Sequence, residues 1–189
     1  MNLSLIKLVI ASIAILIISA CNPALLTYQL DPEIPHLNQL AGDAKIVALK
    51  VIDARTDSAS DNSGQKTISG PTEEAKLLQR KLMELLKNNG YKIINKTLLA
   101  DVAFEIEITN LELTIESSTF KSIIRGKSEI KLTANRHSQQ WSKIFRATRQ
   151  QEVANPANNL DATGVMNQML TKQFSNMFDD DSLRDFLAK

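Results

Sequence analysis

Cysteine and histidine are scarce in this sequence of 189 residues, which contains one cysteine and two histidines. A single cysteine excludes an intrachain disulfide framework and a cysteine-clustered zinc or iron–sulfur site. The histidines, His36 and His137, lie in a proline-spaced stretch and in an expected turn, so neither is held beside a nucleophile as a catalytic triad requires. Because no nucleophile, base and orienting group come together, we expect that the protein is not an enzyme. A hydrolase in particular is disfavoured.

An excess of charge of one sign is also missing, since 22 Lys and Arg residues face 21 Asp and Glu residues. A nucleic-acid-binding protein would show a clustered basic excess, so we expect no nucleic-acid partner. A calcium loop needs oxygen ligands at alternate positions, whereas Asp53, Asp57 and Asp61 are four residues apart. We therefore expect no metal site.

One long apolar run is present, at the N-terminus. Residues 1–20 carry a single charge, Lys7, and their apolar core from Leu8 to Ile18 is followed by small residues. A membrane-spanning helix needs about 20 apolar residues, so this core is short for a retained anchor helix. Residues 1–20 are instead typical of a signal peptide, with cleavage expected between Ala20 and Cys21.

The single cysteine follows this run directly, and Ile18-Ser19-Ala20-Cys21 resembles the lipobox of bacterial lipoproteins. In that class the cysteine thiol receives a diacylglycerol, the signal peptide is removed, and the new amine is acylated. The resemblance implies this covalent lipid on Cys21 and no other cofactor. Several acyl chains give a stable membrane anchor, whereas one chain gives marginal binding. Asn22, where enteric inner-membrane lipoproteins carry aspartate, favours the outer membrane, with the protein facing the periplasm.

Residues 21–44 are expected to form the lipidated N-terminus and a tether. Prolines punctuate this stretch, and it shows no sustained strand or helix period. Fully extended, it would reach roughly 70–80 Å. Part of it is expected to lie against the domain instead, because it contains Leu25, Leu26, Tyr28, Leu30 and Ile34. Residues 45–189 are expected to form a single periplasmic domain, which is long enough to fold without disulfides.

Within this domain the hydrophobic pattern predicts the element order β-α-β-β-β-α-α. A strand over 45–52 precedes a polar loop over 58–70 and a helix that begins at Pro71 and ends at Asn88-Asn89-Gly90. From Val102 the period is two, and its parity changes near Thr109-Asn110, which indicates a β-bulge. Two further strands follow, and then a helix capped by Asp161 and a short helix beginning at Ser182. We therefore expect an α+β fold in which an antiparallel four-stranded sheet carries two main helices on one face.

These features resemble the YajG-type outer-membrane lipoproteins. The resemblance rests on the lipobox, the tether and the order of four short motifs: Asp53-Ala54-Arg55-Thr56-Asp57, Leu77-Leu78-Gln79, Gly90-Tyr91 and Phe145-Arg146-Ala147. It implies an envelope lipoprotein of unestablished biochemical activity and brings no catalytic residues. The element order is also similar to that of small envelope lipoproteins that serve as accessory parts of larger machines.

Two groups of charged residues are candidate contact sites for a ligand or partner. Asp53, Arg55 and Asp57 follow the first strand, where an ion pair or loop anchor is favoured over ligand binding. A second group shares one strand face and could contact anionic lipid headgroups or an acidic partner; it consists of Arg125, Lys127 and Lys131. Glu129 lies in the same row, which favours an ordinary charged solvent face.

Two hypotheses for the function remain. In the first, the protein is a lipid-anchored accessory protein whose sheet face or edge binds another envelope protein. In the second, it is a binding module for a small envelope ligand, such as a cell-wall fragment or a lipid. The second requires a pocket of roughly 300–1,000 Å³. The sequence leaves the oligomeric state open.

Overall fold

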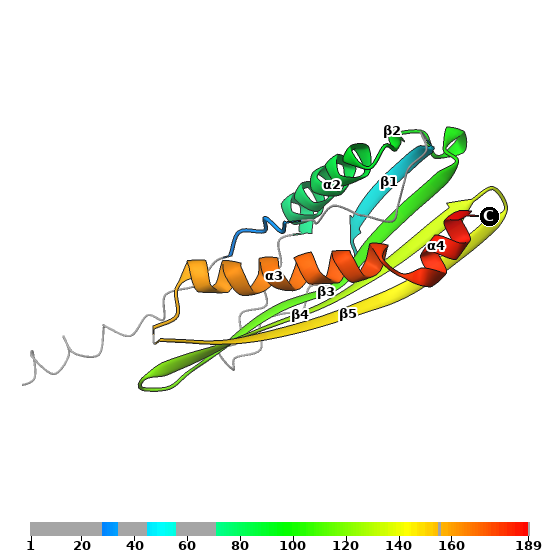
Figure 1. Ribbon diagram of the computed structural model, residues 1–189. Helices are drawn as coiled ribbons and strands as arrows, with labels where there is room; N and C mark the ends of the chain where they lie inside the picture. Colours follow the sequence, from blue (N-terminus) through cyan, green and yellow to red (C-terminus); the bar gives the residue numbers. More distant parts are fainter. Residues whose placement is uncertain (1–27, 34–44, 56–70, 155, 189) are drawn as a thin grey trace, which may run out of the picture.

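The computed structural model describes residues 28–33, 45–55, 71–154 and 156–188. A five-stranded sheet forms the centre of the fold, with the strand order β2-β1-β3-β4-β5 (Figure 1). The strands are Ile46–Asp53 (β1), Lys92–Ile94 (β2), Val102–Ser117 (β3), Lys121–Arg136 (β4) and Gln139–Ala154 (β5). The last three strands form a long twisted ribbon, to which β1 and β2 add at one end.

The sheet is mixed, so the expected antiparallel four-stranded sheet is wrong. β1 runs parallel to both of its neighbours, β2 and β3, and only the β3–β4 and β4–β5 pairs are antiparallel. The parallel pairing arises because helix α2 (Pro71–Asn88) crosses over the sheet after β1 and returns the chain to the end where β1 began. The fifth strand, β2, is absent from the sequence-based prediction, because three residues are too few to show an alternation.

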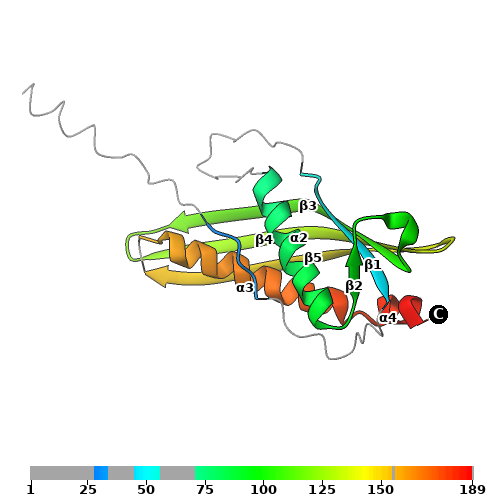
Figure 2. The same cartoon turned by 90° about the horizontal axis from the view of Figure 1, so that it is seen from above.

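The three α-helices of the described residues lie on one face of the sheet, as the sequence predicts for the two main helices (Figures 1 and 2). They are α2, α3 (Asn159–Phe178) and α4 (Asp181–Ala188), and a short 3₁₀ helix, η2 (Thr97–Leu99), links β2 to β3. α2 packs over β1, and α3 runs along β4 and β5. The opposite face of the three long strands carries no helix in the described part of the chain.

Two local predictions are confirmed. Helix α2 ends at Asn88, and Gly90 has a φ of 87°, a left-handed conformation that glycine adopts without a steric penalty. The register between β3 and β4 shifts between Ile108 and Asn110, which is the bulge predicted from the change of parity. The extra residue turns the apolar side chains on both sides of the bulge toward the helices.

The caps of the last two helices differ from the prediction. Asn158 is the N-cap of α3, and its side chain accepts the N–H of Asp161 while the Asp161 carboxylate accepts the N–H of Asn158. Asp161 is therefore the third residue of a capping box rather than the cap itself. At α4 the carboxylate of Asp180 accepts the N–H of Ser182, so Asp180 is the cap.

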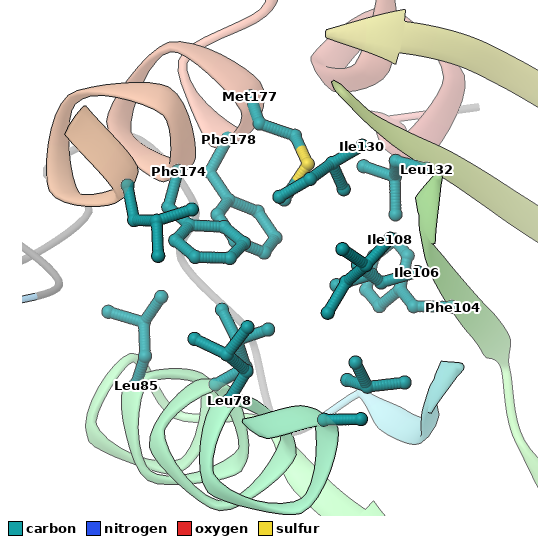
Figure 3. Close-up of a cluster of buried hydrophobic side chains, with 14 of the residues drawn as sticks. Leu78, Leu85, Phe104, Ile106, Ile108, Ile130, Leu132, Phe174, Met177 and Phe178 are labelled. Atoms are coloured by element: carbon teal, nitrogen blue, oxygen red, sulfur yellow. The ribbon is translucent and has the colours of Figure 1, made fainter. Parts of the chain in front are cut away.

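The core lies between the sheet and the three helices (Figure 3). The methionine and phenylalanine side chains of α3 are buried there. α3 approaches β4 closely at Gly126, where a Cβ atom would lie 3.1 Å from the Sδ atom of Met169. The side chains that fill this layer include Leu78, Leu85, Phe104, Ile106, Ile108, Ile130, Leu132, Phe174, Met177 and Phe178.

One buried polar side chain joins α3 to the sheet. The Gln173 amide nitrogen donates to the carbonyl of Phe145 on β5 at 2.9 Å, and the Ser128 hydroxyl on β4 donates to the Gln173 amide oxygen. Both ends of this amide are therefore satisfied, as a buried polar group requires. The two bonds fix the position of α3 across β4 and β5.

Candidate functional site

The outer face of the sheet, which is the face away from the helices, presents rows of charged side chains. On β4 this row contains Arg125, Lys127, Glu129 and Lys131, which alternate with buried residues of the inner face. The three predicted basic residues are therefore on one face and in line. On β3, Glu107 is opposite Lys131 and Glu112 is opposite Lys127, while Glu116 lies two residues beyond the position opposite Arg125.

The acidic neighbours pair with most of this basic row. Arg125 forms an ion pair with Glu116, and its Nε atom donates to Gln150 at 2.9 Å. Lys131 lies 3.2 Å from a carboxylate oxygen of Glu107. The carboxylate of Glu129 accepts from Arg146 on β5 at 2.6 Å, while Lys127 is exposed. The outer face is thus a surface of alternating, mutually paired charges rather than a field of one sign.

β5 forms one edge of this sheet and, among the described strands, pairs only with β4. It is 16 residues long and contains neither proline nor glycine. Along an antiparallel edge strand, every second residue directs its N–H and C=O away from the neighbouring strand. β5 therefore presents a row of backbone donors and acceptors roughly 50 Å long.

The second predicted group lies where β1 ends. Arg55 donates to both carboxylate oxygens of Asp53, at 2.9 and 2.5 Å, and to the carboxylate of Glu74 on α2 at 2.6 Å. The ion pair expected between Asp53 and Arg55 is therefore confirmed. The side chains of Asp53, Arg55 and Glu74 are 5%, 11% and 16% exposed, so the guanidinium is enclosed by its partners. Asp57 lies outside the described residues.

Burial and charge shift the pKa values in this cluster. The hydrogen bond to Asp53 is the main cause that raises the pKa of Arg55 above its ordinary value. Burial raises the pKa of Glu74, although Arg55 acts in the opposite direction, and burial together with the Glu74 charge raises the pKa of the nearby Tyr28 phenol. The cluster thus joins β1 and α2 through charges that satisfy one another. The Tyr28 hydroxyl is buried beside it and has no hydrogen-bond partner among the described residues.

Residues 28–33, here called the N-terminal clasp, lie along α3. Their side chains confirm that part of the expected tether packs on the domain, since Leu30 is 4% exposed and belongs to the core. Asp31 also forms an ion pair with Lys81 on α2. The hydrogen bonds to α3 are Gln29 N–H to Thr163 Oγ1 (3.1 Å), Asp31 N–H to Asn167 Oδ1 (2.8 Å) and Asn167 Nδ2 to the carbonyl of Gln29 (3.2 Å).

The described residues line at least two hollows on the surface of the domain. One, of about 630 Å³, follows the side of α2 between Lys76 and Asn88. The other, of about 310 Å³, lies between β1, β3 and the residues before η2, and its lining includes Lys50, Gln79 and Glu105. Both are surface features with mixed polar and charged linings. A ligand site of the second hypothesis would instead be a pocket with a mainly apolar lining.

In the part of the chain that the structure describes, no group of three or more His, Cys, Asp or Glu side chains is placed to hold a metal ion. None of the helices in this part of the chain is long and apolar enough to span a membrane.

The family of the chain follows from its sequence over most of its length. Residues 32–188 match a protein family described as uncharacterized lipoproteins. The chain belongs to this family. The resemblance to the YajG-type lipoproteins is thereby confirmed. No curated protein matches the sequence significantly.

Several solved structures resemble this lipoprotein at low sequence identity. Protein XCC0632 from Xanthomonas campestris is 12% identical, with a TM-score of 0.45 over 86% of this chain and 95% of that chain. The hypothetical protein CT253 from Chlamydia trachomatis is 13% identical, with a TM-score of 0.45 over 76% of this chain and 97% of that chain. Lipoprotein GNA1162 from Neisseria meningitidis is 11% identical, with a TM-score of 0.35 over 70% of this chain and 99% of that chain.

Sequence reasoning alone missed two features of the lipoprotein. Glu74, the second partner of Arg55, is separated from it by 19 positions, and no local spacing indicates that they meet. The full length of β5 was also missed: the pattern predicts a last strand over 141–151, whereas β5 covers Gln139–Ala154, and the absence of proline and glycine from this range is a signal of a long regular strand.

Proposed function

We propose that this lipoprotein is an accessory protein of the outer membrane that binds another envelope protein and catalyses no reaction itself. In this proposal residues 1–20 are a signal peptide, Cys21 carries a diacylglycerol and an acyl chain, and the domain faces the periplasm. Membership of a lipoprotein family and the sequence Ile18-Ser19-Ala20-Cys21 support the lipid anchor. Asn22 supports the outer membrane.

The observation that carries the binding role is the long edge of β5, which pairs with no strand on its outer side among the described residues. An extended segment of a partner can add to such an edge as a further strand, with affinity from backbone hydrogen bonds and specificity from alternate side chains. Charged side chains on an edge strand discourage its pairing with edge strands of unrelated proteins. Those on β5 are Lys143, Arg146, Arg149 and Glu152. The outer face next to this edge is a paired, polar surface, which suits a partner that is bound and released in water.

Photocrosslinking in cells tests this role. A benzoylphenylalanine placed at Thr148 or Gln150, exposed residues of β5, should capture the same envelope protein in both cases. The matched control is benzoylphenylalanine at Glu84, an exposed residue of α2, the helix that packs over β1 rather than over β5. If β5 captures nothing above background, or if Glu84 captures the same protein equally well, the edge is not the binding site.

The lipid anchor is tested separately by fractionation of Gram-negative cells that express the full chain or Cys21→Ala. The parent should be processed, should incorporate labelled palmitate, and should sediment with the outer membrane. The variant should remain unprocessed and carry no label. A variant that is processed and membrane-bound to the same extent as the parent would contradict lipidation at Cys21.

A further inference from the structure

The N-terminal clasp fixes the direction from which the chain arrives at the domain. Gln29 bonds to Thr163 and Asp31 bonds to Asn167, so the clasp runs parallel to α3. From Asp31 back to Gln29, toward lower residue numbers, the clasp approaches the first turn of α3. This inference rests on the proposed lipid anchor: Cys21 is seven residues before Tyr28, so the lipid lies at most about 25 Å from that residue. The start of α3 therefore belongs to the end of the domain nearest the membrane.

The tip of the β3–β4 hairpin lies at this same end. Lys121, the first residue of β4, is opposite Ala154, the last residue of β5, and α3 begins a few residues later. Figures 1 and 2 both show the hairpin projecting past the first turn of α3. The hairpin tip is thus the part of the described domain that reaches furthest toward the anchored end.

An aromatic side chain is held out at this tip. Ser118 donates both its N–H, at 2.8 Å, and its hydroxyl, at 2.9 Å, to the carbonyl of Lys121, and the hydroxyls of Ser117 and Ser122 lie 2.9 Å apart. These bonds close the turn around Phe120, which is 87% exposed. Turns favour Gly, Asn, Asp, Pro and Ser, so the turn itself gives no reason for an aromatic residue here.

A second exposed apolar side chain lies at the same end. Leu160, in the first turn of α3, is 82% exposed. The neighbouring charges Lys121 and Glu152 pair with each other at 2.9 Å, so this end offers an apolar surface rather than a basic one. An exposed aromatic and an exposed leucine beside an acylated terminus fit the boundary between lipid headgroups and acyl chains, where apolar side chains are buried by membranes.

We propose that Phe120 and Leu160 insert into the surface of the phospholipid bilayer that holds Cys21. The lipid and the two side chains together then orient the domain, with the long strands leading away from the membrane. Leu98 and Leu99 on η2, which are 99% and 65% exposed, lie at the far end of β3. They would point into the periplasm and provide a matched control.

The test uses the lipidated protein in vesicles of phosphatidylethanolamine and phosphatidylglycerol. Cys21 is the one cysteine of the chain and its thiol is occupied by the lipid, so an introduced cysteine can be labelled alone. An environment-sensitive fluorophore at Phe120→Cys should be quenched several-fold more strongly by bromolipids or spin-labelled lipids than the same fluorophore at Leu98→Cys. Equal quenching of the two labels, in protein that floats with the vesicles, would overturn the insertion while leaving the lipid anchor intact.

A second measurement assigns the contact to the two side chains. With the fluorophore at Thr119→Cys, the double variant Phe120→Ser and Leu160→Ser should lose most of the quenching, whereas Leu98→Ser with Leu99→Ser should keep it. Unchanged quenching in the first pair would overturn the role of these side chains. Protein that carries no lipid and does not float would overturn the anchor of the proposed function, and the insertion with it.

Discussion

At the scale of single residues, Arg55 shows how a charged side chain can join three segments. Its guanidinium is enclosed by Asp53, which ends β1, and by Glu74 on α2, next to Tyr28 of the clasp. Two carboxylates and one guanidinium leave no positive charge for a ligand. We infer that this group stabilises the fold at the point where the N-terminal clasp meets β1 and α2.

Replacement of Arg55 should therefore destabilise the protein more than a surface substitution would. In Arg55→Met the carboxylates of Asp53 and Glu74 are left close together without a cation, and breaking an enclosed ion pair in this way costs about 3–5 kcal/mol. The free energy of unfolding, measured by urea denaturation, should fall by a little less, since the groups are not fully buried. Adding Asp53→Asn and Glu74→Gln should recover much of the loss. A single variant as stable as the parent would contradict the role of this cluster.

Gly126 lies where α3 approaches β4 closely. A Cβ atom there would lie 3.1 Å from the Sδ atom of Met169 and 3.2 Å from that of Met166. Gly126→Val should lower the free energy of unfolding by about 1–3 kcal/mol, because the added methyl groups overfill this layer. Gly126→Ala is the control and should have the smaller effect, since flexible thioethers can move by tenths of an ångström. Thermal unfolding in which both variants match the parent would show that the layer has spare volume.

At the scale of elements, the alternation of apolar residues and the residues that end helices predicted most of the helices and strands. The structure confirms three predictions that depend only on neighbouring residues. They are the alternation over 102–134, the bulge at its change of parity and the helix end at Gly90. The direction of β1 was predicted wrongly because alternation carries no information on direction. The strand–helix–strand order around α2 did contain that information, since a helical crossover joins parallel strands. The contacts of Arg55 show the same limit. The ion pair with Asp53, two positions away, was predicted correctly, whereas the contact with Glu74, which is distant in sequence, was not.

The cap of α4 gives a prediction at this scale. Burial acts to raise the pKa of Asp180, but hydrogen bonds from Lys143, Ser182 and the N–H of Leu183 outweigh it, so the pKa lies below its ordinary value of 3.8. A lowered carboxyl pKa stabilises the fold above the unfolded-state pKa, and this contribution is lost as the pH falls through the folded-state pKa. Asp180→Asn keeps a cap but loses the charge, so its deficit in stability relative to the parent should shrink as the pH is lowered below about 4.

Asp180→Ala separates the cap from the charge. It should cost about 0.5–2 kcal/mol at neutral pH, because the first N–H groups of α4 lose their acceptor. Denaturation of both variants between pH 3 and pH 7 provides the measurement. If the deficit of Asp180→Asn is the same at both ends of this range, the charge of Asp180 makes no contribution to stability.

At the scale of the whole molecule, the N-terminal clasp changes the expected reach of the protein from its anchor. A free stretch over 22–44 would let the domain move roughly 70–80 Å from the membrane. The clasp ties residues 28–33 to α3, so at most seven residues separate Cys21 from the part of the chain that contacts the domain. In the proposed arrangement, the lipid on Cys21 holds the hairpin tip near the bilayer, and β5 runs away from the membrane toward a partner in the periplasm.

This geometry predicts a dependence on the length of the chain between Cys21 and Tyr28. Inserting about twenty Gly and Ser residues after Pro23 lowers the effective concentration of the hairpin tip at the membrane roughly seven-fold, by the −3/2 power of chain length. Quenching of a fluorophore at Phe120→Cys by spin-labelled lipids should fall accordingly, although the protein still floats with the vesicles. A rigid insertion of the same length is the control and should abolish the quenching. If the flexible insertion leaves the quenching unchanged, the hairpin binds the bilayer through its own affinity, and the short connection to the lipid is not what orients the domain.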